Sequence, residues 1–479
     1  MKIKFISDLR TTAEKRSLSK NKLYTVSISV VLASLIITLI TFYFWSSSYL
    51  KPENVKLLTS SQTSSLTAYL NQTYPMERGQ GLKPLPYPVV NADLSINAGA
   101  AILVDASNGC VLFEKNADEL IPPASITKLF VMYIVFKEIE EGNLSLDDLV
   151  SPPEVSWTVN MPSDASLMFL GQGHQVTVRE LLTGLSVASG NDAALAIANK
   201  ISGNTKDFIA RMNYEAQALG LTHTHFDDCS GYSEFNMTTP RELAEFCRIY
   251  ISRYPQSLSD YHSCKSITYP LQKNLPSWLQ HKGDTMAVTQ KNTNPLLGVM
   301  PGCDGLKTGF IYESGYNLAL TAERNGVRFL SITMMGPGEG TKQGNYYRTL
   351  DGNTLMNFAF SAFADYKPWE HISSAYTVPT PGSKEKFINL IPAWNNTVTV
   401  PHLYANTAIE DAASVKAEVS IPKYIKGGAN LGAIYGQIQY KLGDTVLETV
   451  PLVADRNAPK CGLWGRFWGT MAALRIAGN

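Results

Sequence analysis

The feature that most constrains this chain is an uncharged run from Leu23 to Trp45. These 23 residues contain no Asp, Glu, Lys or Arg, and as an α-helix they would be about 34 Å long, enough to cross the core of a bilayer. Residues 1–22 carry seven Lys or Arg against two acidic residues, Asp8 and Glu14. Because basic flanks stay in the cytoplasm, the sequence predicts a basic cytoplasmic segment 1–22, a transmembrane helix 23–45 and an extracytoplasmic remainder.

A cleaved signal peptide is the alternative interpretation of the same run. Ser46, Ser47 and Ser48 supply small residues near a possible cleavage point. The apolar run is longer than the apolar part of a typical signal peptide. An uncleaved signal anchor is therefore the favoured prediction.

The composition excludes several classes of protein. The 41 basic and 41 acidic residues cancel, so nothing indicates a nucleic-acid partner. The six cysteines form no C-x-x-C pair, which argues against a zinc ribbon or a redox motif. His223 and His225 lie close to Asp227 and Asp228 in the sequence, but a loop role is the favoured interpretation. We expect neither a metal nor a cofactor.

The chain divides by composition after the apolar run. Residues 46–91 are rich in Ser, Thr, Gln and Pro and predict a linker. The runs 98–105 and 109–114 resemble two strands joined by a turn. A second pair, 315–322 and 327–334, is joined at Asn325-Gly326, a dipeptide that is typical of a hairpin turn.

A possible nucleophile opens a predicted helix in the stretch Pro122–Phe130. Ser125 and Lys128 are three residues apart, so one helical turn can bring them together. A serine hydroxyl needs a base to remove its proton, and a lysine can be that base only when it is neutral, as burial favours. The pattern S-x-x-K recurs at Ser17, Ser19, Ser48, Ser383 and Ser420, so it is weak by itself.

Two further elements follow Ser125 in a domain-sized region. Ser189-x-Asn191 lies between two apolar helical runs, where a short polar link can project a hydroxyl and an amide into a cleft. A similar Ser-Gly-Asn at Ser202 is interpreted as a turn at a helix end. Lys307-Thr308-Gly309, the only K-T-G in the chain, precedes the Asn325-Gly326 hairpin, so we expect Lys307 on a strand at the edge of a sheet.

The order S-x-x-K, S-x-N, K-T-G resembles that of the penicillin-binding proteins of low molecular mass, specifically the D-alanyl-D-alanine carboxypeptidases. The likeness includes Ser166-Leu-Met-Phe-Leu, Thr238-Thr-Pro-Arg-Glu-Leu and Asn292-Thr-Asn-Pro-Leu-Leu. It is strong over residues 92–365. It continues over residues 366–457, chiefly through Gly432–Tyr440 and Glu448–Val453.

The resemblance implies an α/β (α+β) fold. Residues 92–365 would form a β-lactamase-like, DD-peptidase catalytic domain with a five-stranded antiparallel sheet flanked by helices. Residues 366–457 would form a smaller all-β domain, which the alternation in 415–421 and 434–440 supports independently.

The same resemblance implies roles for individual residues. Ser125 would be acylated by the penultimate D-alanine of a peptidoglycan stem peptide that ends in D-Ala-D-Ala, and Lys128 would accept its proton. Ser189 and Asn191 would relay protons and hold the substrate amide. Lys307, Thr308 and Gly309 would contact the substrate near its free carboxylate, Arg348 would help to bind that carboxylate, and the backbone N–H groups of Ser125 and Phe310 would form the oxyanion hole.

The expected function is that of a membrane-bound serine carboxypeptidase on the periplasmic side of a bacterial inner membrane, inhibited covalently by β-lactams. Three alternatives remain open: a β-lactamase, a DD-endopeptidase, and a non-catalytic penicillin-binding scaffold or sensor. The family often has His or Tyr and then Thr where this chain has Phe310 and Ile311. The loss of that threonine hydroxyl could alter turnover or β-lactam affinity.

The C-terminal tail, 458–479, predicts a second membrane contact. Its apolar residues recur at intervals of three and four, and Trp464 and Trp468 stand among basic residues. This pattern suits an amphipathic helix at a membrane interface. A helix packed on the second domain is the alternative.

Overall fold

The computed structural model describes residues 2–49, 55, 57–74, 81–87, 94–282, 286–401 and 415–478. Parts of the predicted linker (50–54, 56, 75–80 and 88–91), the predicted domain start at 92 and the last tail residue lie outside the described residues. The helices are α1 Lys2–Ser47, α2 Ser60–Thr73, α3 Lys128–Glu140, α4 Val178–Thr183, α5 Asn191–Ser202, α6 Thr205–Ala218, α7 Pro240–Arg253, α9 Gly340–Ala362 and α11 Leu463–Gly478.

The strands form one large sheet, one medium sheet and three pairs. The large sheet has the order β1-β3-β2-β10-β9-β8, and the medium sheet has the order β12-β13-β17-β16-β15. The strands are β1 Lys83–Pro84, β2 Ala100–Asp105, β3 Cys110–Lys115, β4 Leu149–Val150, β5 Val176–Thr177, β6 Ser266–Tyr269, β7 Val288–Lys291, β8 Cys303–Ile311, β9 Gly315–Arg324, β10 Val327–Gly336, β11 Phe363–Tyr366, β12 Tyr376–Pro379, β13 Phe387–Pro392, β14 Val398–Pro401, β15 Lys416–Ser420, β16 Ile434–Leu442 and β17 Thr445–Ala454.

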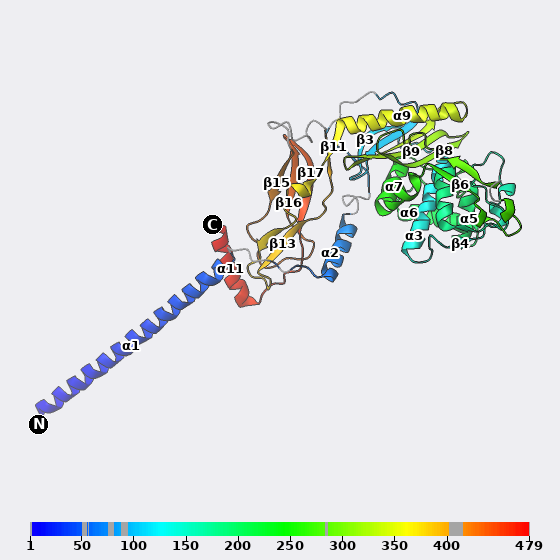
Figure 1. Ribbon diagram of the computed structural model, residues 1–479. Coiled ribbons are helices and arrows are strands. Elements are labelled where there is room, and N and C mark those ends of the chain that lie inside the picture. The colour runs from blue at the N-terminus through cyan, green and yellow to red at the C-terminus, as the bar shows by residue number, and fades with distance from the viewer. Residues whose placement is uncertain are drawn as a thin grey trace.

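Helix α1 continues the predicted membrane span on both sides. Residues Lys22–Ser47 are the one stretch within the described ranges that is long and apolar enough to cross a membrane, with a mean hydropathy of 2.4. Leu23, Val31, Ile37 and Phe44 are exposed, and α1 extends alone from the rest of the chain (Figure 1). A helix that is apolar all round and exposed along most of its length is suited to lipid.

The large sheet is antiparallel from β3 to β8, and these five strands match the expected sheet. The two-residue strand β1 adds a sixth, parallel to β3, which the sequence did not predict. The β9–β10 hairpin turns at Asn325 and Gly326, which both have positive φ (54° and 76°). This confirms the predicted hairpin, because the tight turn that suits two twisted strands needs positive φ at both residues.

The two faces of the sheet bury different side chains. In β2, Ala100, Ile102 and Val104 join the core that contains α3 and α7, whereas Ala101 and Leu103 join the core under α9. This alternation follows from the two-residue period of a strand. Helix α9 therefore covers one face and the group α3–α7 covers the other (Figure 1).

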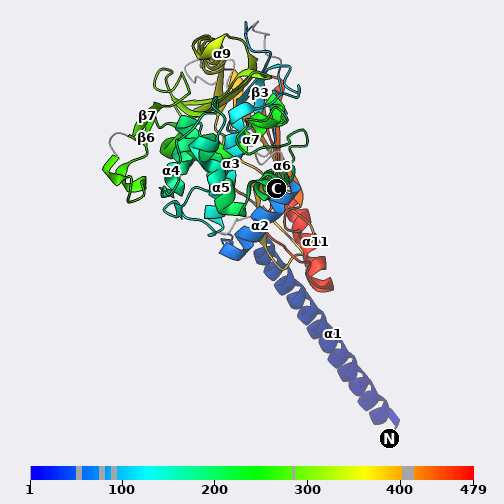
Figure 2. The same ribbon diagram turned by 90° about the vertical axis from the view of Figure 1, so that its right-hand side faces the viewer.

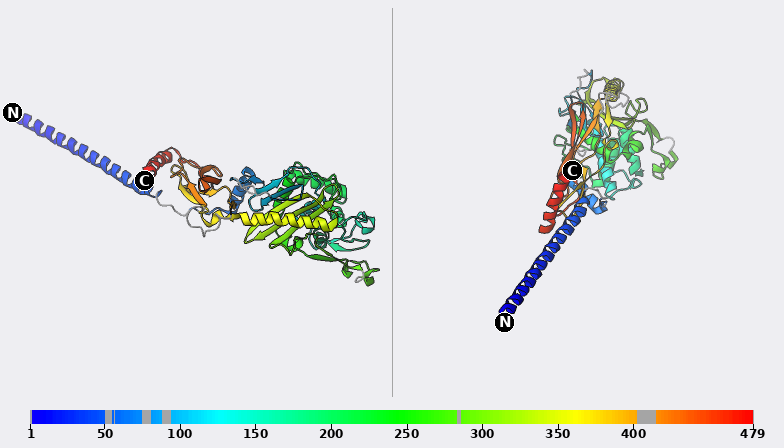
Figure 3. Two further views of the ribbon diagram at one scale, coloured as in Figure 1. Left: turned by 90° about the horizontal axis from the view of Figure 1, so that it is seen from above. Right: turned by 90° about the vertical axis from the view of Figure 1, so that its left-hand side faces the viewer.

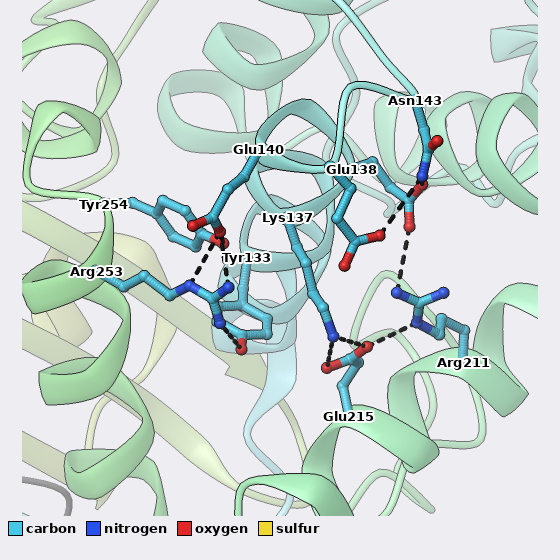
Figure 4. A network of polar contacts seen from close by, with 10 residues as sticks. Tyr133, Lys137, Glu138, Glu140, Asn143, Arg211, Glu215, Arg253 and Tyr254 are labelled. Atoms are coloured by element: carbon cyan, nitrogen blue, oxygen red, sulfur yellow. Dashed lines mark hydrogen bonds and ion pairs between the residues drawn. The ribbon is translucent and has the colours of Figure 1, made fainter. Parts of the chain in front are cut away.

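Polar contacts attach the C-terminal half of α3 to its neighbours (Figure 4). Lys137 and Arg211 both contact the carboxylate of Glu215 at 2.7 Å, and Glu215 is buried. Arg253 of α7 contacts Glu140 at 2.7 Å. These bonds fix the helix whose first turn carries Lys128.

The medium sheet has a core of its own, to which a helix of the linker contributes. Leu66 and Leu70 of α2 are buried in the same core as Leu390 and Ile438 of the sheet. The sequence predicted a linker here and did not indicate this helix. A Thr59–Gln62 capping box starts α2, and this pattern was the available signal.

The C-terminal helix α11 packs against both the end of α1 and the medium sheet. Trp468 contacts Phe42 with ring centroids 5.4 Å apart, and Arg475 Nη1 donates to the carbonyl of Tyr43 at 2.8 Å. Gly469 lies against Gly382, in the loop that joins β12 and β13 of that sheet. The opposite face exposes Leu463, Trp464, Phe467, Met471 and Leu474. The two helices lie on the same side of the medium sheet, away from the large sheet (Figures 2 and 3).

Candidate active site

The first candidate residues lie where a short 3-10 turn, Ala124–Thr127, leads into α3. Pro122 and Pro123 precede the turn, and Ala124 adopts a positive φ of 51°, which is uncommon for a residue with a side chain. Ser125 is half-buried at the surface of the turn, and Lys128 is fully buried beneath it. The local geometry thus exposes a hydroxyl above a buried amine.

The Lys128 ammonium contacts three oxygens. Its Nζ lies 2.8 Å from Ser125 Oγ, 2.7 Å from Asn191 Oδ1 and 2.5 Å from the carbonyl of Ser230. The structure therefore brings together three of the residues that the sequence singled out. The carbonyl of Ser230 was not among them. Every residue has a backbone carbonyl, so the residue type gives no indication of this contact.

Ser189 and Asn191 lie in the expected link between two helices. Ser189 has a positive φ of 56° and ends the π-helical turn Gly184–Ala188, and Asn191 begins α5. The Asn191 N–H donates to the carbonyl of Ser166 at 2.8 Å, and the Asp192 carboxylate accepts the N–H of Met168 at 2.8 Å. This loop is therefore tied to the segment 166–170.

Strand β8 forms the opposite wall, at the edge of the large sheet as expected. Lys307 Nζ donates to Ser189 Oγ at 3.0 Å, and Thr308 Oγ1 donates to Thr293 Oγ1 at 2.7 Å. Thr293 was not singled out individually in the sequence. Lys307 is buried, so its charge faces the cleft residues and not solvent.

Gly309 brings β8 against the turn that carries Ser125. A Cβ at Gly309 would lie 2.7 Å from the carbonyl oxygen of Pro123 and 3.2 Å from the backbone nitrogen of Ser125. A side chain there would push the two segments apart. The next residue, Phe310, is partly exposed and packs on Tyr316, with ring centroids 4.3 Å apart.

Arg348 lies on α9, behind β8. Its guanidinium stacks over the Tyr316 ring at 4.8 Å and donates to the carbonyl of Gly309 and to Asn345 Oδ1. Its Nε is buried and has no hydrogen-bond partner within the described part of the chain. Arg348 therefore contacts the K-T-G backbone directly.

Burial changes the proton affinities of all three cations. It lowers the pKa of Lys128 to about 8 and that of Arg348 to about 10. Burial also lowers the pKa of Lys307, and the charges of Lys128 and Arg348 add to this effect. A lysine with a pKa near neutrality can serve as a base, which an ordinary lysine cannot.

His223 and Asp228, two residues of the histidine and aspartate group noted in the sequence, have other contacts. His223 Nδ1 lies 2.9 Å from Glu242 Oε1, and the carboxylate of Asp228 accepts backbone N–H groups of its own loop. Throughout the described ranges, no three His, Cys, Asp or Glu side chains gather in a way that could hold a metal ion.

Comparison with known proteins agrees with this geometry. A family model described as D-alanyl-D-alanine carboxypeptidase matches residues 88–338, and one described as the C-terminal domain of penicillin-binding protein 5 matches residues 363–460. The chain is similar to the D-alanyl-D-alanine carboxypeptidase DacD of Salmonella typhimurium, with 35% identity over 383 residues, 78% of this chain and 89% of the relative. DacF of Bacillus subtilis is 28% identical over 381 residues, 78% of this chain and 88% of the relative.

Solved structures show the same likeness. Penicillin-binding protein 5 from Haemophilus influenzae has a TM-score of 0.65 and 26% identity over 78% of this chain and 100% of its own. Penicillin-binding protein 6B from Escherichia coli has a TM-score of 0.59 and 27% identity over 76% of this chain and 98% of its own.

Proposed function

Because the chain belongs to the D-alanyl-D-alanine carboxypeptidase family, a family of serine hydrolases, we propose that it removes the terminal D-alanine of peptidoglycan stem peptides through an acyl-enzyme on Ser125. One observation carries this proposal: a fully buried lysine, Lys128, holds its amine 2.8 Å from the hydroxyl of Ser125. The hydroxyl and a base with a lowered pKa are thus in contact before any substrate arrives.

Acylation starts from the neutral form of Lys128. Ser125 Oγ attacks the carbonyl carbon of the penultimate D-alanine as its proton passes to Lys128 Nζ. The tetrahedral intermediate then expels the nitrogen of the terminal D-alanine, which takes up the proton through Ser189 and Asn191. One C–O bond forms, one C–N bond breaks, and D-alanine leaves.

The developing oxyanion needs donors that are in place beforehand. We assign this role to the backbone N–H groups of Ser125 and Phe310. The close approach of Gly309 to the Ser125 nitrogen supports it, because it aligns β8 with the turn that carries Ser125. Since only backbone atoms are involved, the unusual Phe310 side chain does not prevent the role.

The free carboxylate of the substrate would bind beside β8. Lys307 and Thr308 supply a cation and a hydroxyl, and Arg348 adds a second positive charge from behind Gly309. A charged carboxylate is well matched to such fixed donors. Water then attacks the acyl-enzyme with Lys128 again as the base, and the shortened peptide leaves.

A β-lactam would acylate Ser125 in the same way, which makes it both an inhibitor and a probe. We also propose that α1 stays in the inner membrane with its basic end in the cytoplasm, and that α11 makes a second membrane contact through its exposed apolar face. In this arrangement residues 92–365 are the catalytic domain and 366–457 are a smaller domain between it and the membrane.

Release of D-alanine is the direct test of the proposal. The full chain in detergent micelles is mixed with a peptide that ends in D-Ala-D-Ala, and free D-alanine is measured beside the Ser125→Ala variant. Release by the wild type alone supports the proposal. Rapid hydrolysis of penicillin without release of D-alanine would indicate a β-lactamase, and cleavage of crosslinked muropeptides alone would indicate an endopeptidase. Penicillin binding with neither D-alanine release nor crosslink cleavage would indicate a scaffold or sensor.

A further inference from the structure

The loop 228–233 reaches the site from a direction that the motifs do not indicate. Its Ser230 carbonyl accepts a hydrogen bond of 2.5 Å from Lys128 Nζ. Gly231 follows with a φ of 77°, and a Cβ there would lie 1.9 Å from the carbonyl oxygen of Ala124. The loop therefore packs directly on the turn that carries Ser125.

Asp228 holds this loop in place. Its carboxylate accepts the backbone N–H groups of Ser230, Gly231 and Ser233, the second at 2.7 Å. A short acidic side chain that caps its own loop in this way is a strong local constraint. The Ser230 carbonyl is consequently fixed two residues from the capping carboxylate.

Asn236 attaches the same loop to the nucleophile turn. Its Oδ1 accepts the N–H of Asp228 at 2.9 Å, and its Nδ2 donates to Thr127 Oγ1 at 3.2 Å. Asn236 is fully buried. The loop and the turn thus behave as one packed unit, and the position of Asp228 is tied to that of Lys128.

The Ser230 carbonyl decides how a neutral Lys128 can be oriented. A neutral amine has two N–H bonds and one lone pair, whereas the ammonium has three donors. The Asn191 Oδ1 and the Ser230 carbonyl can only accept hydrogen bonds, so they take the two N–H bonds. The lone pair then faces the third neighbour, Ser125 Oγ, as proton abstraction requires.

We propose that Asp228 is a positioning residue for Lys128: by fixing the loop 228–233, it keeps the Ser230 carbonyl and a negative charge beside the amine. The inference rests on the proposed function, since it assigns a role within that reaction. Asp228 touches no substrate. It acts through the orientation and the proton affinity of Lys128.

Four ionisable groups face Lys128 from the packed elements. Asp228 and Cys229 belong to the loop, Asp192 to α5 and Lys307 to β8. Burial raises the pKa of the Cys229 thiol to about 12, so it stays neutral. Asp192 is bound to the backbone of the segment 166–170 and cannot be changed without moving the Ser189 loop. Asp228 is the negative charge that can be altered separately.

The test is the pH dependence of Ser125 acylation by a fluorescent penicillin, measured on the full chain from about pH 6 to 10. Burial lowers the pKa of Lys128, and Asp228 opposes this effect. Asp228→Asn removes the opposing charge, so the midpoint of the rise in rate should move to lower pH by about one unit. The plateau rate should fall about tenfold or more, because the carbonyl is less well fixed.

Asp227→Asn is the matched control. Asp227 is the adjacent residue, it is exposed, and its carboxylate accepts a bond from Ser233 Oγ at 3.0 Å without contact with Lys128. The midpoint of the rise in acylation rate with pH should be the same for Asp227→Asn as for the wild type. Equal effects of the two variants, or a lower rate for Asp228→Asn with no shift in the midpoint, would overturn the inference.

A further variant keeps the test informative if Asp228→Asn does not fold. Asp228→Ser retains a side-chain oxygen that can accept loop N–H groups but carries no charge, and the same shift is expected. An unshifted midpoint in a folded Asp228→Ser chain would refute the inference. Failure of the proposed function is distinguishable, because the wild type would then release no D-alanine from a peptide that ends in D-Ala-D-Ala, whatever the midpoints of the variants.

Discussion

Lys307 Nζ lies 3.0 Å from Ser189 Oγ, although 118 residues separate them in the sequence. This bond closes the cleft between the edge strand β8 and the loop before α5. It places a cation beside the hydroxyl that is proposed to pass a proton to the leaving amine. This part of the site therefore depends on the packing of the sheet against the helices and not on a local motif.

Lys307→Gln should weaken the recognition of the substrate's carboxylate. The loss of one charged hydrogen bond is worth about 1.5–3 kcal/mol, or roughly a ten- to hundredfold loss in kcat/KM. The measurement compares a D-Ala-D-Ala peptide with its C-terminal amide. The wild type should strongly prefer the free acid and the variant should not; an unchanged preference in the variant would remove Lys307 from the carboxylate site.

Acylation of Ser125 should speed up with rising pH. The pKa of Lys128 is lowered to about 8 by burial, so the amine is mostly protonated below that pH and mostly neutral above it. Only the neutral form accepts a proton, and the rate should rise about tenfold per pH unit before it levels off near pH 8. Stopped-time labelling with a fluorescent penicillin measures this rate, and a flat or falling profile would contradict Lys128 as the base.

Glu215→Gln should destabilise the catalytic part of the chain. The variant leaves Lys137 and Arg211 without their shared buried carboxylate, at a cost of about 2–4 kcal/mol. Urea unfolding of both chains measures the difference. Asp147→Asn is the control, because Asp147 forms an exposed pair with Arg179 at 3.4 Å and should change stability by less than about 1 kcal/mol.

Gly309→Ala should separate β8 from the start of α3. The added Cβ would lie 2.7 Å from the Pro123 oxygen, closer than real Cβ contacts allow. We expect penicillin acylation to fall by about a hundredfold, since a shift of about 1 Å at an active site has that effect. Gly462→Ala meets no atom within 4 Å and should leave the rate unchanged; similar rates for the two variants would show that the close approach is unimportant.

The mature protein should retain α1. Arg475 contacts the carbonyl of Tyr43 and the hydroxyl of Ser46, and the ring of Trp468 contacts that of Phe42. These contacts exist only if the segment before Ser46 stays attached. The intact mass of the protein from membranes should include residues 1–47. A mature chain that begins near Ser46 would establish the signal-peptide interpretation instead.

The elements with strong local patterns could be predicted from the sequence. The Asn325-Gly326 hairpin, the apolar run from Leu23 and the edge position of Lys307 all follow from turn chemistry or periodicity. The contact of Ser125 with Lys128 follows from helical spacing, since both residues lie within one turn. Each of these features depends on the sequence of a short segment or on the order of neighbouring strands in the sheet.

Features that depend on backbone atoms or tertiary contacts could not be predicted. The carbonyl of Ser230 is an acceptor that any residue could supply, and only the fold brings it to Lys128. The burial of Leu66 in the second core depends on a sheet that forms more than 300 residues later. The sequence around α2 is mostly polar and does not indicate that Leu66 packs against this sheet.

The central claim is that Ser125 is the nucleophile, and mass spectrometry of the penicillin adduct tests it most directly. The full chain is incubated with penicillin, its intact mass is measured, and the modified peptide is identified after proteolysis. The account predicts one penicillin per chain, attached to Ser125 and absent from Ser125→Ala. An adduct on another residue, or none at all in a folded chain, would contradict it.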